Sequence, residues 1–337
     1  MIKIFQLFLP GIKSFKSIKK EIDNTSISRE RFIDFIKVLG LLMIIVNTNF
    51  LIRFGDSYGE YLIFNLSFSD PLKATYSWFT VGMALFFFSV GFTNKIAWYA
   101  NVGRDGSQWK FLTDRVNALL GPAIVWIFVI TLSLNIYSRF ANIPLFFTSQ
   151  DDGIVPLTEF IMWPLWLVSI YLVVVIFCPV TLFLHKTNPY LTLFGLIFAT
   201  VAVDTFEFSI AFSYLKLINY LLFWLAIHQL GYFFADGQIF SIKLSFFTTI
   251  FIFCFGYLFY INNTSEEFMS LSSYRLIMSS NEDPPTIYYL IASLGLSSGL
   301  LILRKPIEKF LENKIIWSVF SFIHANIFTL FLWHIFI

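Results

Sequence analysis

The chain has 337 residues, of which 57% are hydrophobic and 13% charged, and its mean hydropathy is +0.74. Soluble domains carry about 25% charged residues, so the composition excludes an ordinary soluble domain and predicts an integral membrane protein in a lipid bilayer. The net charge is +2 with both signs evenly mixed, and no basic stripe with interleaved aromatics is present, so nucleic acid is not expected as a partner.

The first 30 residues form a basic segment with interspersed apolar residues. Its apolar opening is too short for the core of a signal peptide, and Pro10 and Gly11 interrupt it. We interpret residues 1–30 as a basic amphipathic segment on the cytoplasmic leaflet or, alternatively, as a disordered basic tail. Residues 31–337 are expected to form one transmembrane domain, because the linkers between the apolar stretches are short.

About nine apolar stretches follow, each near the length of about 20 residues that crosses a bilayer. They cover approximately residues 33–53, 76–98, 117–138, 158–183, 190–212, 214–235, 239–261, 285–303 and 316–337. The sequence therefore predicts an all-α fold, a multi-pass bundle of about nine transmembrane helices. The last stretch stops within an apolar run, so we expect either a span that ends at the membrane surface or a truncated C-terminus.

The charges of the loops predict the orientation of these helices. Lys and Arg gather in the N-terminal segment and in the 99–116 and 304–315 loops, whereas acidic residues gather in the 139–157 and 262–284 loops. Cytoplasmic loops carry the excess of Lys and Arg. The N-terminus is therefore expected in the cytoplasm and the C-terminus on the other side.

The first apolar stretch carries polar residues along one face. Lys37 and Thr48 are eleven residues apart, which places them on nearly the same helix face and about 16 Å apart along the axis. Asp34 lies close to that face, and Asn47 and Asn49 flank Thr48. Lys37 either belongs to a functional site or extends its charge to the membrane surface. The Asn-Thr-Asn run either belongs to a functional site or forms hydrogen bonds between helices.

Several polar residues in the later apolar stretches have no single interpretation. Asp204 and Glu207 share a helix face and form either an acid–base pair within the membrane or a polar group at its outer surface. His228 lies within an apolar stretch and is either a catalytic group or a buried histidine bonded to a neighbouring hydroxyl. His324 and His334 are ten residues apart and need not face the same site.

The familiar motifs of soluble enzymes are absent. The chain has no Walker loop, no HExxH, no GxSxG and no Cys/His cluster with metal-ligand spacing. Its two cysteines, Cys178 and Cys254, lie in apolar runs and are expected to be core residues. No metal cofactor is predicted.

Five short stretches, taken together and in order, resemble the acyltransferase 3 family of membrane-bound enzymes. Their sequences are FFFSVG, RVNALLGP, PLWL, NEDPPT and TLFLWH, at Phe86–Gly91, Arg115–Pro122, Pro164–Leu167, Asn281–Thr286 and Thr329–His334. The second resembles an R-x-x-R-L-x-x-P signature in which Asn117 or Ala118 replaces an arginine, and the last is similar to T-x-Y-L-W-H. The resemblance covers nearly the whole chain from about Arg29.

The resemblance implies transfer of an acyl group, acetyl foremost, from cytoplasmic acyl-CoA to a carbohydrate or other polar acceptor of the envelope, in the inner membrane of a bacterium. The family has an arginine at the head of its first span and, eleven residues later, a histidine proposed as the base. Lys37 and Thr48 stand at these positions here. Because a threonine hydroxyl is no base at neutral pH, His334 or His228 would have to act instead, with Thr48 and Asn47 positioning a group.

Arg104, Lys110 and Arg115 are candidates for binding the phosphates of CoA, because guanidinium and ammonium groups bind phosphate well. The alternative is that they are ordinary charges of a cytoplasmic loop. Two other functions stay open. The missing histidine fits a non-catalytic member that serves as a membrane partner or scaffold, and Asp204 with Glu207 fits a transporter or flippase of a polar or lipid-linked substrate.

Overall fold

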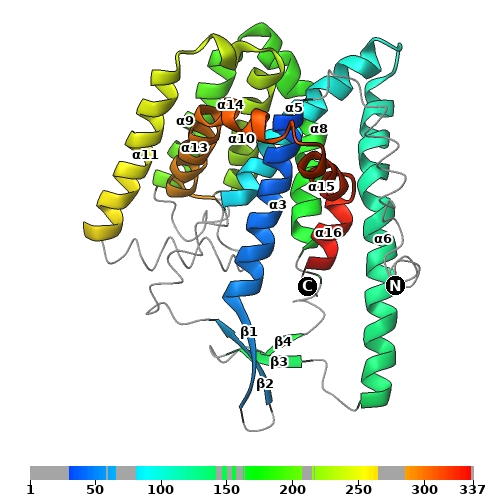
Figure 1. The fold of residues 1–337 in the computed structure, drawn as a ribbon. Coiled ribbons are helices and arrows are strands. Elements are labelled where there is room, and N and C mark those ends of the chain that lie inside the picture. Colours follow the sequence, from blue (N-terminus) through cyan, green and yellow to red (C-terminus); the bar gives the residue numbers. More distant parts are fainter. Residues whose placement is uncertain are drawn as a thin grey trace.

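Long apolar helices stand side by side in the computed structural model, and most of them run roughly parallel to a common axis (Figure 1). The structure describes residues 30–57, 60–65, 81–141, 146–149, 154–156, 162, 164–206, 215, 217–264 and 285–334, with backbone alone for 47–65, 137–138, 141, 146–156 and 262–264. Within this part of the chain, the helical bundle agrees with the predicted fold class.

The helices overlap the predicted apolar stretches, except α14, which lies within the predicted 304–315 loop. Their bounds are α3 Arg31–Leu51, α5 Gly82–Val102, α6 Gln108–Ala141, α8 Leu165–Thr187, α9 Pro189–Thr205, α10 Asn219–Ala235, η3 Gln238–Ser241, α11 Leu244–Thr264, α13 Ile287–Ile302, α14 Arg304–Phe310, α15 Lys314–Ala325 and α16 Ile327–Trp333. Polar caps fix several of these starts. Asn188 caps α9, where Pro189 occupies the first turn, and Thr286 caps α13.

Three helices of the described chain are long and apolar enough to cross a membrane, or up to five if each bent pair counts as one span. The three contain Gln108–Ile136, Leu165–Thr187 and Leu244–Ile261. The stretch 316–337, expected as one span, is bent by 66° between α15 and α16, and α13 and α14 meet at 60°. The count of nine spans therefore stays a prediction, while the helical membrane protein is supported.

A small sheet joins two predicted loops, which is a feature that the sequence did not predict. Its strands are β1 Ile52–Ser57, β2 Glu60–Asn65, β3 Phe146–Ser149 and β4 Ile154–Pro156, in the order β1-β2-β3-β4. β1 and β2 form an antiparallel hairpin, and β2 pairs in parallel with β3. The sheet lies at the end of the molecule opposite to α14, and β1 continues directly from α3 (Figure 1).

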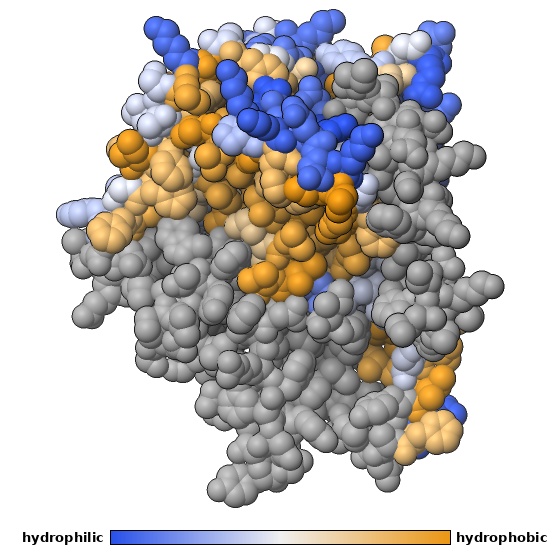
Figure 2. Space-filling model, in the orientation of Figure 1, coloured by the Kyte–Doolittle hydropathy of each residue, from blue (hydrophilic) through white to orange (hydrophobic). Residues whose placement is uncertain are grey.

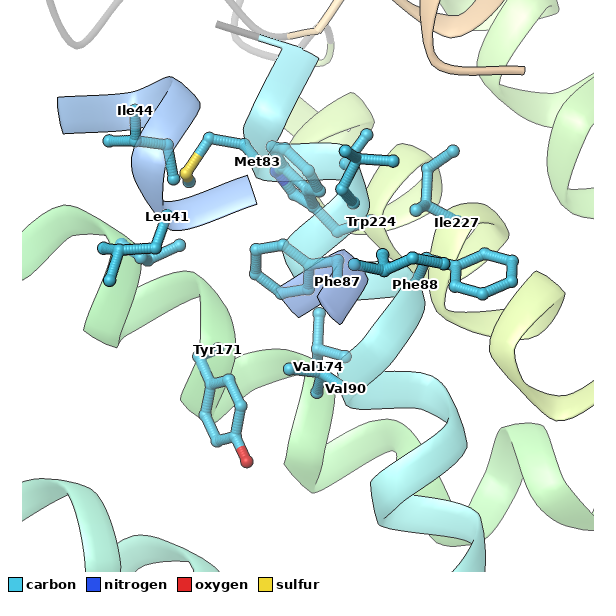
Figure 3. Packing of buried hydrophobic residues seen from close by; sticks show 14 of the residues in the cluster. Leu41, Ile44, Met83, Phe87, Phe88, Val90, Tyr171, Val174, Trp224 and Ile227 are labelled. Carbon is cyan, nitrogen blue, oxygen red and sulfur yellow. The ribbon is translucent and has the colours of Figure 1, made fainter. Parts of the chain in front are cut away.

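The core is centred on α5, which packs between α3 and α10. Gly91 of α5 and Gly231 of α10 make this contact close, because a Cβ on either would overlap a backbone carbonyl of the other helix. The rings of Phe87 and Trp224 pack 4.4 Å apart between their centroids, within the buried apolar cluster of Figure 3. Side chains facing this core are apolar, whereas hydrophilic residues gather at the end that carries α14 (Figure 2).

Candidate functional site

Two cations from different helices converge inside the bundle. Lys37 of α3 is half-buried and places its Nζ 5.5 Å from the centroid of the Phe86 ring. Arg115 of α6 is also half-buried and donates to the backbone carbonyl of Thr93, at 3.2 Å. The guanidinium of Arg115 is close enough to repel the charge of Lys37. A region of positive charge therefore lies between α3, α5 and α6.

Tyr171 of α8 adds a hydroxyl to these cations. The side chain is buried, and its hydroxyl lies close enough to Arg115 and to Asn94 to interact with both. Figure 3 shows this hydroxyl pointing away from the apolar side chains of Leu41 and Met83. Tyr171 thus carries polar contacts from Arg115 on α6 to Asn94 on α5.

His228 of α10 completes the group and is fully buried. Its Nε2 lies 3.1 Å from Nδ2 of Asn94, and the ring packs edge-on against Tyr232 with 4.9 Å between centroids. Among the described residues, Nδ1 of His228 and Oδ1 of Asn94 have no hydrogen-bond partner. We call Lys37, Asn94, Arg115, Tyr171 and His228 the inner cluster.

The pair of Asn94 and His228 can exist in two hydrogen-bonded forms. The amide of Asn94 either donates to Nε2 or, when turned by 180°, accepts from a protonated Nε2. In the second form the lone pair of Nδ1 is available to take a proton from another molecule. The inner cluster therefore combines a nitrogen base with two cations, which suits chemistry in which a proton is removed and negative charge develops nearby.

A second polar group lies at the end of α10, and we call Lys95, His185, Gln229 and Asp236 the outer network. Nζ of Lys95 is 2.5 Å from Oδ1 of Asp236, and Nε2 of His185 is 2.9 Å from Oδ2 of the same carboxylate. Gln229 reaches the other ring nitrogen of His185, at 2.6 Å. Burial raises the pKa of Asp236, but hydrogen bonds from Lys95 and His185 outweigh it and hold this pKa below its ordinary value.

The sequence signal for these additional residues was weak. Asn94 and Lys95 stand near the end of a predicted span, and Asp236 stands in a predicted turn, so each had an ordinary explanation as an interfacial residue. Tyr171 lies four residues beyond the PLWL stretch of the family resemblance, where the sequence assigns it no role. A clue was present on α10, where Gln229 and Asp236 are seven residues apart and therefore share a helix face.

The structure divides the three predicted phosphate ligands. Arg104 and Lys110 are exposed at the turn between α5 and the start of α6, and Arg104 donates to the carbonyl of Ala100, at 3.0 Å. Arg115 belongs to the inner cluster instead. Arg104 and Lys110 are therefore accessible to a charged ligand outside the bundle, whereas Arg115 could contact a ligand inside the bundle.

His334 follows α16 and is fully buried. Its Nδ1 contacts the carbonyl of Phe331, and its ring stacks on that of Phe331 with 5.2 Å between centroids. The contacts that define the inner cluster do not include His334. The preceding Leu332 and Trp333 line a cavity of about 10 Å³ against α6, which is about the room of one water molecule.

Other predicted positions have different outcomes. The side chains of Asn47 and Thr48 lie outside the described part of the structure, as does Glu207. Asp204 accepts a hydrogen bond from the backbone N–H of Ile287, at 2.8 Å, and so caps the start of α13. Within the described chain, no three His, Cys, Asp or Glu residues come together as a metal site, and Cys178 and Cys254 are buried free thiols.

Comparison with protein families decides the class of the protein. A family model described as an acyltransferase domain matches residues 30–337, which is nearly the whole chain. The chain belongs to the acyltransferase 3 family. Comparison with curated proteins and with solved structures gives no match. Family membership confirms the resemblance drawn from the sequence motifs and, with the apolar helices, supports a membrane acyltransferase in general terms.

Proposed function

We propose that this acyltransferase 3 family protein transfers an acetyl group from cytoplasmic acetyl-CoA to a hydroxyl of a carbohydrate or other polar envelope acceptor. Donor and acceptor follow from the family resemblance. The proposal includes about nine spans in a bacterial inner membrane, with the N-terminus in the cytoplasm, as the loop charges predict. The convergence of Lys37, Arg115 and His228, three separately predicted residues, is the observation that carries the proposal.

The inner cluster supplies the groups that such a transfer requires. His228 takes the proton of the acceptor hydroxyl while the hydroxyl oxygen attacks the thioester carbonyl. Lys37 and Arg115 stabilise the negative charge on the carbonyl oxygen. The carbon–sulfur bond then breaks, the ester remains on the acceptor, and the proton returns from His228 to the sulfur of CoA. Asn94 positions His228 by a hydrogen bond, and the hydroxyl of Tyr171 interacts with Arg115.

The donor would approach from the exposed end of α6. Arg104 and Lys110 are exposed there and suit the phosphates of CoA. From Lys110 to Arg115 the helix advances about 7.5 Å toward the inner cluster. An extended donor bound at the surface by its phosphates therefore leads inward along α6.

The test is an acetyl-transfer assay in membranes with acetyl-CoA as donor. We expect His228→Ala to lower kcat by about 10²- to 10⁴-fold, the usual contribution of a general base. Expression and folding are checked by size-exclusion chromatography. Loss of activity with His334→Ala, while His228→Ala stays active, would move the base to His334 and overturn the role given to His228.

A non-catalytic role as a membrane partner or scaffold is the second candidate, and Thr48 at the position of the family histidine favours it. In that case wild-type protein is inactive and Thr48→His alone confers transfer. Asp204, which also suggested a transporter, caps α13. Uptake of substrate that Asp204→Asn abolishes without any dependence on acyl-CoA would restore the transporter hypothesis.

A further inference from the structure

Two short helices leave the direction of the bundle at its hydrophilic end. The chain bends by 60° between α13 and α14 and by 66° between α15 and α16. Helices α14 and α15 therefore lie between these two bends (Figure 1). We call residues 304–325 the elbow. The asparagine Asn313 caps α15 inside the elbow, through backbone N–H groups of Ile315 and Ile316.

One side of the elbow is held against the bundle. The guanidinium of Arg304 lies 3.8 Å from the centroid of the Phe240 ring. Arg31, at the start of α3, donates to the carbonyl of Leu311, at 2.9 Å, and lies 4.9 Å from the centroid of the Trp317 ring. Leu311 and Trp317 are buried. These contacts hold the elbow against the bundle, so its opposite side faces away from the bundle.

The opposite side combines exposed apolar side chains with exposed cations. Phe310, Ile315 and Val319 are 50%, 78% and 49% exposed. The lysines of the elbow are exposed and form no ion pair with the residues that the structure describes; they are Lys305, Lys309 and Lys314. Of the acidic residues here, Glu308 pairs with Arg304, at 2.6 Å, and Glu312 is exposed. Hydrophilic surface lies directly above apolar surface at this end (Figure 2).

We propose that the elbow binds anionic phospholipids of the leaflet in which it lies. Ile315 and Val319 are four residues apart on one face of α15, so both side chains enter the apolar boundary of the bilayer together. Lys309 and Lys314 extend their ammonium groups to the headgroups at the same depth. A zwitterionic lipid satisfies the apolar contacts alone, whereas an anionic headgroup also pairs with the lysines. The charge therefore selects the lipid.

The experiment uses the purified full chain in nanodiscs of phosphatidylcholine mixed with phosphatidylglycerol, and native mass spectrometry counts the lipids that stay bound. We expect phosphatidylglycerol to be enriched over its share of the nanodisc. Lys309→Gln with Lys314→Gln should remove most of this enrichment, because each lysine near a surface contributes about fivefold. The control pair is Lys186→Gln with Lys243→Gln, which are exposed lysines of the same end of the bundle.

The outcomes separate the proposal from a general effect of charge. Selective loss with the elbow pair, restored by Lys309→Arg with Lys314→Arg, supports the site. Absence of enrichment in the wild type, or equal loss with the control pair, overturns it. Both pairs concern exposed residues, so folding is expected to be unchanged, and acyl transfer is not needed for the measurement.

Discussion

The inner cluster and the outer network are neighbours along α10, yet their groups are paired to different degrees. His228 and Asp236 are eight residues apart, or about 12 Å along the helix axis. Each oxygen of the Asp236 carboxylate has a partner, from Lys95 and from His185, although Oε1 of Gln229 in the same network is buried without one among the described residues. In the inner cluster, by contrast, Nδ1 of His228 and Oδ1 of Asn94 are buried without a partner among the described residues.

This difference separates a stabilising role from a chemical one. A buried polar atom without a partner costs about 1–3 kcal/mol, so it weakens the fold unless another molecule satisfies it. A paired ionic network, in contrast, joins the helices that carry it, here α5, α8 and α10. We therefore infer that the ion pairs of Asp236 serve the fold and that the inner cluster serves a bound molecule.

The largest expected effect comes from separating α5 and α10, since both polar regions depend on their contact. In Gly231→Ala the new Cβ would overlap the carbonyl of Phe88. We expect this change to destabilise the protein by about 3 kcal/mol. Thermal unfolding in detergent measures the effect, and Gly195→Ala is the control, because nothing lies within 4 Å of that Cβ. Equal effects of the two changes would contradict a close contact.

The next effect concerns the outer network. Asp236→Asn leaves Lys95 as a buried charge without its carboxylate, and we expect a loss of about 2 kcal/mol, less than for a fully buried pair because Asp236 is partly exposed. Lys95→Met should cost less, since the Asp236 carboxylate keeps contact with water. The Lys95 side chain is 3% exposed and that of Asp236 is 33% exposed. Unfolding temperatures of both variants test this order.

The same carboxylate predicts a dependence of stability on pH. Because the folded state lowers the pKa of Asp236, the unfolded state binds the proton more tightly. The stabilisation is therefore complete at pH values above the ordinary pKa and is lost as the pH falls through the folded pKa, below about 4. Unfolding temperatures of Asp236→Asn should show a smaller decline in this acidic range than those of the wild type. A parallel decline would exclude Asp236 as the titrating group.

The smallest change in stability is expected in the inner cluster. The double variant Asn94→Leu with His228→Phe replaces both members of an incompletely paired group with apolar side chains. We expect its stability to stay within about 1 kcal/mol of the wild type, while acetyl transfer is abolished. Unfolding temperature and transfer rate are measured on the same preparation. A loss of stability as large as that of Asp236→Asn would assign the inner cluster a structural role.

Much of the bundle could be predicted, because a transmembrane stretch leaves a continuous apolar signal in the sequence. Helix α8, for example, shares residues 165–183 with a predicted span. Hydropathy does not report bends within a stretch, so the 66° angle between α15 and α16 was missed. It also gives no signal for strand pairing between distant loops, so the partnership of β2 with β3 was missed as well.

The site was predictable residue by residue but not as an arrangement. Lys37 and His228 were identified because each is costly or unusual in an apolar stretch, and Arg115 was identified as a candidate for binding phosphate. Their convergence depends on three helices that are far apart in the sequence. Asn94 escaped notice because an asparagine near a span end is common, and its value comes from a close helix contact that a glycine at position 91 permits.

The small sheet has a mechanical consequence for the two helices that carry the cations. β1 extends α3, and β3 lies just beyond the end of α6, so pairing of β1 to β2 and of β2 to β3 ties the far ends of both helices together. At its other end, α3 is fastened by Arg31 to Leu311 and Trp317. Because both ends of α3 are anchored, we expect this helix to resist rotation and sliding, so that Lys37 keeps its position before any substrate arrives.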